Sequence, residues 1–390
     1  MQTVLNRTLE NGPGGGGRAP LAEVAATLSA DFAGRAENHD AADTFVAENY
    51  AALKKAGLMA AGVPAELGGG GAGVRELCDM LRTLAAGCGS TALAFAMHTH
   101  QVAIPAWRWH HQPQARPAVE PLLRRVAAEG LVLISSGGSD WVGGSGRAER
   151  VEGGYRIHAT KRFSSGSPMG SLLVTGAVSD EADGPFVVHF AAPFSAPEVR
   201  VLDTWHTLGM RGTGSHDVVI EGLFIPDDKI SLKRKAGVWH PVFQIIATTA
   251  LPLIYAVYLG IAEGARDVAI GMAAKQPASG ATARLAGEVD TALAAARMAH
   301  RSMIEAVERN QPSAQSVSEV MIGRRLVEEN AIRTVERAME LAGGAGFYRV
   351  AGLERRFRDI QGARYHPMRH EVQAEYAGRL ALGQDVSTVF

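Results

Sequence analysis

The sequence predicts an α+β protein with an N-terminal helical domain, a central β-sheet or small barrel, and a C-terminal four-helix bundle. Apolar residues recur at helical spacing over the first third of the chain and again over its last part. Short β-branched runs separated by glycine-rich turns lie between these two regions. The chain has 390 residues, enough for two or three domains with large cores. We expect a flexible leader and three domains, with boundaries 1–20, 21–128, 129–232 and 233–390.

The first domain shows two helical patterns separated by a turn-rich segment. Apolar residues fall on one helical face in each pattern, at Leu21, Val24, Ala25, Leu28 and Phe32, and at Leu77, Met80, Leu81 and Leu84. The glycine-rich stretch 57–71 between them predicts a loop. Residues 1–20 contain four consecutive glycines and no apolar core flanked by basic residues, so we expect a flexible leader and not a secretion signal.

The second and third predicted domains are recognised by a change in the spacing of apolar residues near residue 130. The predicted strands are 131–135, 155–158, 172–175, 186–190 and 218–220. From residue 242 the pattern is helical again, with helices around 268–273, over 281–309 and over 317–342, broken at Pro277 and Pro312. The most apolar stretch, 245–261, contains Pro252 and small polar residues, which indicates a buried helix and not a membrane span.

Composition excludes several classes of function. The net charge is -1 and no dense Lys/Arg tract is present, which argues against nucleic-acid binding. The two cysteines, Cys78 and Cys88, are too few for a disulfide scaffold or a four-ligand zinc site, and they suit a reducing cytoplasm. No G-x-G-x-x-G opens a helix after a strand, so a nicotinamide dinucleotide site of that type is not supported. We expect a cytoplasmic protein that binds neither nucleic acid nor a membrane.

The last fifty residues carry the most informative motif. A helix runs into the glycine cluster 343–346, a basic segment ends in Arg358 and Asp359, and another helix closes the chain. This order resembles the C-terminal signature of the acyl-CoA dehydrogenase superfamily of flavoproteins, "LGGxGY…RxxRDA" followed by "YEGTxxIQ", whose Glu is the catalytic base. Counted from Asp359, His366 takes the Tyr position and Pro367 takes the Glu position. The resemblance therefore implies an acyl-CoA dehydrogenase-like fold whose usual base is absent.

Three central segments resemble the flavin-contacting strands of the same superfamily. Residues 135–140 lie where the family has "TEPxxGSD", residues 161–166 where it has "KxWITNG", and residues 205–226 where it has "GxRGxxxxxxxFxxVxVP". The resemblance implies that Phe163 stacks on the isoalloxazine ring and that the Ser165 hydroxyl lies near N5. The implied flavin contacts are Ser135, Gly138, Ser139, Phe163, Ser165, Arg211, Gly343, Gly344 and Gly346, with the role of Arg211 open. Taken alone, these features would indicate a polar turn, a core aromatic and a helix cap.

Both known base positions of the superfamily lack a carboxylate here. Besides Pro367, the position used by some members on an earlier helix falls in 250–252, which reads Ala-Leu-Pro. Glu371 lies about one helical turn beyond Pro367 and is interpreted as a surface residue. Gln276 and Ser279 replace the Arg and Phe of "RxxFG", which contact the adenosine end of FAD. These departures fit FMN, or reduced flavin supplied by a separate reductase.

Histidines are the remaining candidates for proton chemistry. His366 stands beside the lost base, and His98 and His100 fall where the monooxygenase branch of the superfamily often carries a histidine. Histidine titrates near neutrality and can act as a general acid or base. We therefore predict His366, His98, His100 and Ser165 as catalytic residues. No acidic partner accompanies the histidines at ligand spacing, so no metal site is predicted.

Three functions remain open from the sequence. The first is a flavin monooxygenase that uses reduced flavin and O₂. The second is an FAD-dependent acyl-CoA or acyl-carrier-protein dehydrogenase with an unrecognised base, and the third is a catalytically silent flavin-binding partner. The cofactor is FAD or FMN, and the substrate is an acyl thioester or an aromatic or heterocyclic compound. The resemblance also implies a homotetramer or dimer, with a flavin reductase as a further partner.

Overall fold

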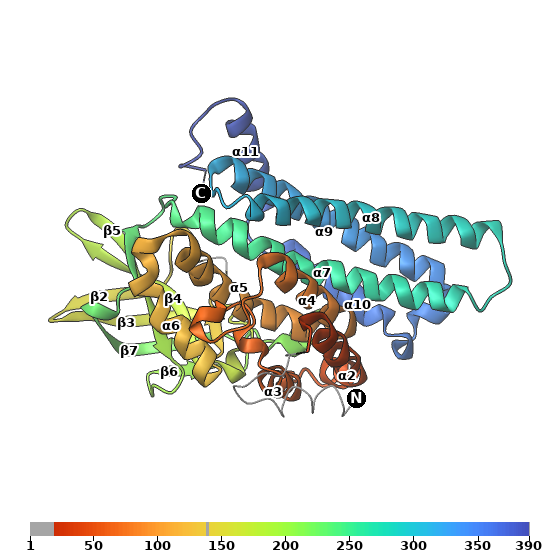
Figure 1. The fold of residues 1–390 in the computed structure, drawn as a ribbon, viewed down its shortest axis with the longest axis horizontal. Helices are drawn as coiled ribbons and strands as arrows, with labels where there is room; N and C mark the ends of the chain where they lie inside the picture. The colour runs from red at the N-terminus through yellow and green to blue at the C-terminus, as the bar shows by residue number, and fades with distance from the viewer. Residues whose placement is uncertain (1–18, 138–139, 390) are drawn as a thin grey trace.

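The computed structural model describes residues 19–137 and 140–389. Its element order is the predicted one: helices, then a sheet, then long helices (Figure 1). The predicted leader 1–20 lies outside the described residues except for Ala19 and Pro20. The predicted domain boundaries stay predictions.

The described helices that precede the sheet pack against the C-terminal domain, mainly through the third and fourth of them. They are α2 Leu21–Ala41, α3 Ala47–Lys55, α4 Val74–Gly87, α5 Gly89–His111 and α6 Arg116–Glu129. The predicted loop 57–71 holds two short 3-10 helices and a tight turn. A Cβ at Gly69 would lie 2.2 Å from the Val63 carbonyl oxygen, so only glycine permits this close approach of two backbone segments.

The described strands form one eight-stranded mixed sheet. They are β1 Leu133–Ser135, β2 Arg147–Val151, β3 Gly154–Lys161, β4 Leu172–Glu181, β5 Gly184–Pro193, β6 Val199–Val201, β7 Val218–Pro226 and β8 Leu232–Lys235. Their order is β6-β7-β3-β2-β4-β5-β8, with β1 parallel to β4. The five predicted strands are confirmed, whereas β2, β6 and β8 were not predicted. Each of the three has at most one buried residue, so it shows no apolar run.

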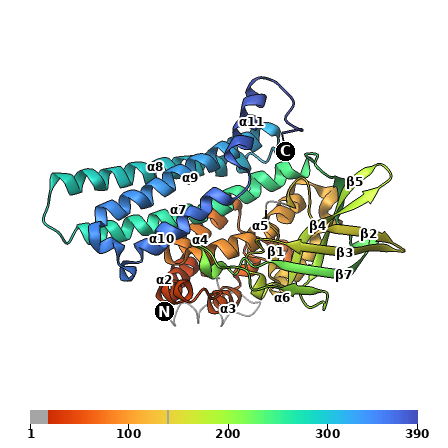
Figure 2. The same cartoon turned by 180° about the vertical axis from the view of Figure 1, so that it is seen from behind.

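The C-terminal domain is built on three long helices, with two shorter ones packed against them (Figure 2). These are α7 Val242–Ala273, α8 Gly280–Glu308 and α9 Ala314–Ala342, followed by α10 Leu353–Ile360 and α11 His370–Ala381. Within residues 19–137 and 140–389, α7 is the one helix long and apolar enough to cross a membrane, and 94% of its most apolar window is buried inside the fold. The prediction of a buried helix over 245–261 is confirmed.

Helices α5 and α7 form the antiparallel pair on which the candidate site is built. At one end, a Cβ at Gly89 would lie 2.8 Å from Cδ1 of Ile261. At the other end, Trp107 and Ile245 line the same pocket. Helix α5 also contacts β1, so it connects the sheet to the C-terminal domain. From the middle of these helices, His98 of α5 bonds to Leu133 of β1, and Tyr258 of α7 bonds to His366 near the end of the chain.

Candidate active site

His366, which is half-buried, forms a hydrogen bond with the fully buried Tyr258 between α7 and the segment that follows α10. The His366 Nε2 atom lies 2.5 Å from the Tyr258 hydroxyl. Burial, with smaller contributions from the Arg324 charge and His100, lowers the pKa of His366 to about 3. Burial also raises the pKa of Tyr258 well above its usual range. Our expectation that His366 titrates near neutrality is therefore corrected: at pH 7 both partners are neutral, and a proton moves along the pair without charge separation only when each group takes up one proton as it releases another.

Arg324 on α9 fixes the segment that carries His366. It is fully buried and pairs with the equally buried Glu328 at 3.0 Å. The rest of its guanidinium donates to the Tyr255 hydroxyl at 2.7 Å and to the carbonyl oxygens of Met368, His366 and Ala363 at 2.7, 3.3 and 3.4 Å. Burial raises the pKa of Glu328, and the Arg324 charge opposes this shift. One side chain thus connects α9 and α7 to the backbone on both sides of His366.

The structure separates the roles of the two predicted catalytic histidines on α5. His98 is fully buried, and both of its ring nitrogens bind the backbone: Nδ1 accepts from the Leu133 N–H at 3.0 Å, and Nε2 donates to the Met59 carbonyl at 2.9 Å. These two bonds connect α5 to β1 and to the 57–71 loop, and they occupy both positions through which His98 could exchange a proton. A catalytic role for His98 stays a prediction, and its contacts are those of a structural residue.

His100 is the α5 histidine close enough to His366 to act on it electrostatically. Its Nδ1 donates to the Ala96 carbonyl at 3.1 Å, and its Nε2 accepts from the Gln101 amide at 3.3 Å. Burial lowers the pKa of His100 to about 4, so it too is neutral at pH 7. Both ring nitrogens of His100 are bonded, as in His98, but the partner of its Nε2 is a side chain at 3.3 Å that can rotate away, so His100 has the better geometric support as a partner of His366.

The segment 163–166 presents an aromatic ring to solvent. Phe163 has φ of 56°, a conformation that costs a non-glycine residue energy, and its side chain is 57% exposed. Trp205 meets the ring edge-on, with centroids 6.0 Å apart at 84°. The structure therefore does not place Phe163 in the core. A fixed, exposed aromatic beside a second aromatic fits a planar ligand such as an isoalloxazine ring.

Two of the predicted flavin segments lie side by side. The Ser165 hydroxyl is 2.7 Å from that of Ser215, which in turn is 2.6 Å from that of Thr213. Backbone bonds join Gly166 N to Thr213 O at 2.9 Å and Ser164 N to His216 O at 3.2 Å. The chain of three hydroxyls can reorient together, so Ser165 can donate or accept toward a ligand.

The other predicted contacts are distributed over several places. Ser135 ends β1, and Gly138 and Ser139 lie outside the described residues. Arg211 donates to the Thr207 carbonyl at 3.0 Å and lies 3.4 Å from Asp43, so it holds its own turn against the end of α2. The cluster 343–346 follows α9: a Cβ at Gly343 or Gly344 would meet nothing within 4 Å, whereas one at Gly346 would be 2.7 Å from that of Ala342. The flavin roles of these residues stay predictions.

Asp359 and Arg358 do not pair with each other. Arg358 pairs with Asp40 and Glu354, and Asp359 accepts from the Met210 N–H at 2.5 Å. Burial raises the pKa of Asp359 to about 6. The Arg-Asp motif therefore attaches α10 to α2 and to the turn that carries Arg211.

Neither base position regains a carboxylate in the structure. Pro367 is part of the loop fixed by Arg324, and residues 250–252 are buried in α7. Glu371 is exposed in the first turn of α11, as the sequence interpretation had it. Sequence reasoning missed Tyr258 and Arg324. Tyr258 could have been noticed as a tyrosine inside the apolar run 245–261. The sequence around Arg324 contains no comparable signal.

The buried, neutral histidines predict that the free energy of unfolding decreases as the pH is lowered. His300 on α8 is almost fully buried, its Nε2 donates to the Pro252 carbonyl at 2.8 Å, and burial lowers its pKa to about 4. The His300 side chain is neutral in both the folded and the unfolded protein above about pH 6.5. Below that pH, the side chain binds a proton in the unfolded chain but not in the folded protein. Stability is lost as pH falls from about 6.5 toward 4, by roughly 2 kcal/mol at pH 5 for this one group.

The test compares chemical unfolding at pH 7 and pH 5 for wild type and His300→Gln. The variant is expected to lose roughly 2 kcal/mol less between the two pH values, since glutamine keeps a donor but does not titrate. The exposed His110→Gln variant serves as the control and should behave as wild type. Equal pH dependence in wild type and His300→Gln would show that His300 does not contribute.

Comparison with known proteins finds two family models and several relatives that match this chain. Residues 18–125 match the family model described as acyl-CoA dehydrogenase, N-terminal domain, and residues 253–371 match acyl-CoA dehydrogenase, C-terminal domain. The amino sugar nitrososynthase DnmZ of Streptomyces peucetius is 29% identical over 350 residues, 85% of each chain. The pigment production hydroxylase of Rhodococcus sp. (strain ATCC 21145) is 26% identical over 395 residues, 95% of this chain and 98% of the relative.

A solved structure is similar over nearly the whole fold. KijD3 in complex with FMN and dTDP-3-amino-2,3,6-trideoxy-4-keto-3-methyl-D-glucose aligns with a TM-score of 0.85 and 27% identity, over 95% of each chain. The matched family models together span more than half of the present chain. The chain therefore belongs to the acyl-CoA dehydrogenase superfamily of flavin-dependent oxidoreductases.

Proposed function

We propose that this protein is a flavin-dependent monooxygenase that uses reduced flavin and O₂ to oxygenate a small organic substrate. The observation that carries the proposal is the neutral His366–Tyr258 pair beside the position where dehydrogenases of the superfamily hold a carboxylate. Removal of an α-proton from an acyl thioester needs a base within hydrogen-bond reach. A neutral pair suits a reaction that moves protons to and from oxygen instead. The nitrososynthase and hydroxylase relatives support the same reaction class.

The residues of this chain divide into those that hold ligands and those that move protons. Phe163 and the Ser165 hydroxyl are the groups best placed to hold a flavin, which supplies the redox chemistry when bound. His366 can take a proton on one ring nitrogen while it releases the other, because its imidazole is neutral at pH 7. Tyr258 supplies the hydroxyl of this relay, and His100 is the neighbouring histidine, which can exchange a proton through Nε2 when the Gln101 side chain moves away.

The substrate class and the partners follow as further parts of the proposal. An amine on a sugar is the first substrate class to test, because the similar relative DnmZ is a nitrososynthase of amino sugars. Aromatic compounds and acyl thioesters remain the alternatives from the sequence. A separate flavin reductase would supply the electrons. The unpaired buried cysteines, Cys78 and Cys88, fit a cytoplasmic location.

A homotetramer or dimer is supported by an exposed apolar segment. After the glycine cluster, Phe347, Tyr348 and Val350 are 80%, 70% and 88% exposed. Exposed apolar side chains grouped in this way are typical of a surface covered by a partner, and light scattering of the flavin-loaded protein measures the assembly.

The first experiment separates oxygenation from dehydrogenation. The flavin-loaded protein is mixed anaerobically with a panel of acyl-CoA thioesters, and the flavin absorbance is followed. We expect no bleaching, and we expect the chemically reduced protein to transfer an ¹⁸O atom from ¹⁸O₂ to an amino sugar nucleotide or an aromatic compound. Bleaching by a saturated thioester would refute the monooxygenase proposal and favour a dehydrogenase. Absence of both reactions would favour a silent flavin-binding partner.

Phe163→Ala is expected to weaken flavin binding about 5- to 150-fold, because stacking on an aromatic ring contributes roughly 1–3 kcal/mol. Stability should change little, since the ring is largely exposed. Flavin fluorescence titration gives the affinity. Phe224→Ala, a second exposed phenylalanine on β7, is the matched control and should bind flavin as wild type does. Unchanged affinity in Phe163→Ala would exclude the ring as a flavin contact.

A further inference from the structure

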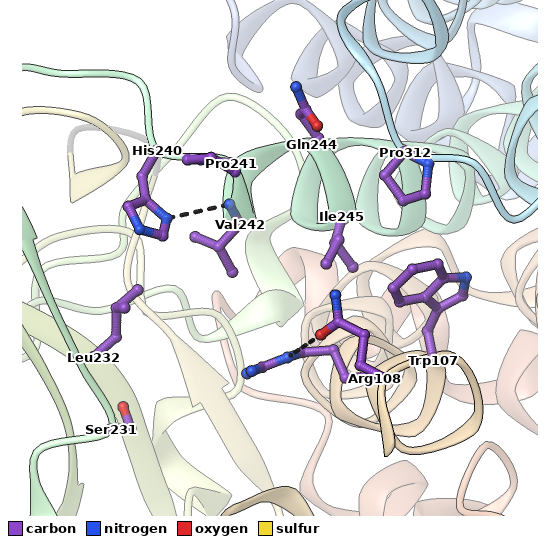
Figure 3. A pocket seen from close by; sticks show the side chains of 11 residues that line it. Trp107, Arg108, Ser231, Leu232, His240, Pro241, Val242, Gln244, Ile245 and Pro312 are labelled. Atoms are coloured by element: carbon purple, nitrogen blue, oxygen red, sulfur yellow. Dashed lines mark hydrogen bonds between the residues drawn. The ribbon is translucent and has the colours of Figure 1, made fainter. Parts of the chain in front are cut away.

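A buried lysine ends β3, two residues before Phe163. The side chain of this residue, Lys161, has no exposed surface. It is the only buried lysine among residues 19–137 and 140–389. It does not line the pocket of about 370 Å³ at the end of α5 (Figure 3). An ammonium taken out of water needs fixed partners in place of the water, so the partners of Lys161 indicate what its charge holds together.

The ammonium of Lys161 connects the end of β3 to β4 and to the loop before β2. Its Nζ atom donates to the Gly176 carbonyl of β4 at 2.6 Å, and to the carbonyl and hydroxyl of Ser145 at 2.9 and 3.0 Å. Asp140 supplies the opposite charge, with its Oδ2 atom 3.1 Å from Nζ and its Oδ1 atom accepting from the Ser145 hydroxyl. An ammonium has three N–H groups, and the three oxygens of Gly176 and Ser145 take them all. Asp140 Oδ2 accordingly makes an ionic contact and accepts no hydrogen bond from the described residues.

Lys161 reaches β4 at a level of the sheet where β2 has not yet begun. Strand β2 lies between β3 and β4 and begins at Arg147, which pairs with His158 of β3. The last three residues of β3 therefore extend beyond β2 and pair with no residue of it. On their other side they pair with β7, up to Lys161 with Val218. The Lys161 side chain thus makes, through its bond to Gly176, the connection toward β4 that β2 makes further along the strand.

The backbone after Lys161 is held in a conformation that an aromatic residue disfavours. Phe163 has φ of 56°, which persists in a non-glycine residue only where the surroundings impose it. The Arg162 carbonyl accepts from the Gly137 N–H at 2.9 Å, and a Cβ at Gly137 would lie 2.9 Å from that of Phe163. The Asp140 N–H donates to the Gly137 carbonyl at 3.1 Å. Gly137, which packs against Phe163, is therefore bonded to the residue that pairs with Lys161.

From these contacts we infer that the Lys161–Asp140 ion pair positions Phe163 for stacking on the flavin. Lys161 holds the strand end two residues before the ring, and Asp140 holds Gly137 against it. The ring is largely exposed, so its own burial does not set its direction. Lys161 has no exposed surface with which to touch a ligand, so it acts through Phe163 as a positioning residue. This inference rests on the proposed flavin contact of Phe163, and it names the residues on which that contact depends.

The test measures flavin affinity and stability in the double variant Lys161→Met with Asp140→Asn. No buried charge is left unpaired in it, and asparagine can still accept from the Ser145 hydroxyl, so it should unfold at a higher denaturant midpoint than Lys161→Met. Flavin affinity should still fall roughly tenfold, because a ring that is no longer held must be ordered on binding. The visible circular dichroism of the bound flavin should change with it. Lys233→Met, which breaks an exposed pair with Glu181, is the matched control and should bind flavin as wild type does.

Adding Phe163→Ala shows whether the ion pair acts through the ring. In that background the double variant should lose less than about threefold in flavin affinity, since the group that the pair positions is already gone. An undiminished loss there would overturn the inference, as would wild-type affinity and dichroism in the folded double variant. Failure of the inference alone leaves flavin binding weakened by Phe163→Ala. Equal binding by Phe163→Ala and wild type would contradict the flavin contact and overturn the inference with it, while the thioester and ¹⁸O₂ experiments decide the reaction class independently.

Discussion

His366→Ala is expected to lower oxygenated product formation by roughly 10²–10⁴-fold, the range typical of a lost proton-transfer group. The ring is one of two neutral partners at 2.5 Å, and alanine removes the one that can exchange protons on both nitrogens. Tyr258→Phe should cost less, about tenfold or more, because His366 keeps its place while losing one partner. Product is measured as ¹⁸O incorporation from ¹⁸O₂ at saturating substrate.

The controls for this prediction separate chemistry from folding. Flavin affinity and unfolding midpoint should stay close to wild type in Tyr258→Phe, and flavin affinity should be retained in His366→Ala. The exposed His110→Gln variant should have wild-type turnover. If His366→Ala keeps more than a third of the turnover while binding flavin normally, His366 is not part of the proton path. In that case His100→Gln becomes the variant that tests the remaining histidine.

The sequence predicted the long elements because their signals are local. Residues 281–309 and 317–342 show sustained helical periodicity between prolines, and the observed helices are Gly280–Glu308 and Ala314–Ala342. Strands β2, β6 and β8 were missed since their stability comes from neighbours. For example, β2 pairs with β3 from Arg147 to Val151 although Ala148 is its one buried residue. Even a pairing with the next strand leaves no apolar run in such a short segment.

The sequence predicted where the candidate site lies, but not the hydrogen-bond partner or the pKa of its histidine. Counting from Asp359 identified His366, because the motif spacing is preserved even though the base is lost. Its partner Tyr258 lies 108 residues away in an apolar helix, and only the packed fold brings the two together. The expectation that His366 titrates near neutrality was wrong for the same reason. Its pKa depends on burial and on the charge of Arg324, and neither can be read from local sequence.

The different arrangement of His98 and His100 was also beyond the sequence. The two residues are two positions apart on α5, so they point to different sides of the helix. The sequence could show this difference in direction, but not that the 57–71 loop and β1 would occupy both nitrogens of His98. Of the two, only His100 has a ring nitrogen bonded to a side chain and not to the backbone, and that nitrogen becomes available to the site when Gln101 rotates.

Arg324→Met is expected to be the most destabilising single substitution considered, at roughly 3–5 kcal/mol in the free energy of unfolding. The substitution leaves Glu328 buried, with His370 as its remaining close partner at 2.9 Å. It also removes the donors to the backbone around His366. Chemical denaturation at pH 7 measures the loss. The exposed Arg301→Met on α8 is the matched control and should change stability by less than about 0.5 kcal/mol.

A double variant shows how much of the stability loss in Arg324→Met comes from the unpaired Glu328 carboxylate. In Arg324→Met with Glu328→Leu, no buried carboxylate is left unpaired, so much of the stability should return, since paired apolar replacement of buried ions is often neutral. Turnover should not return with it, because the loop from Ala363 to Met368 still lacks its donor. Recovery of both stability and turnover would show that Arg324 only neutralises Glu328. A loss below about 1 kcal/mol in Arg324→Met would show that the buried pair does not hold the loop, and that α10 and α11 position His366 by packing alone.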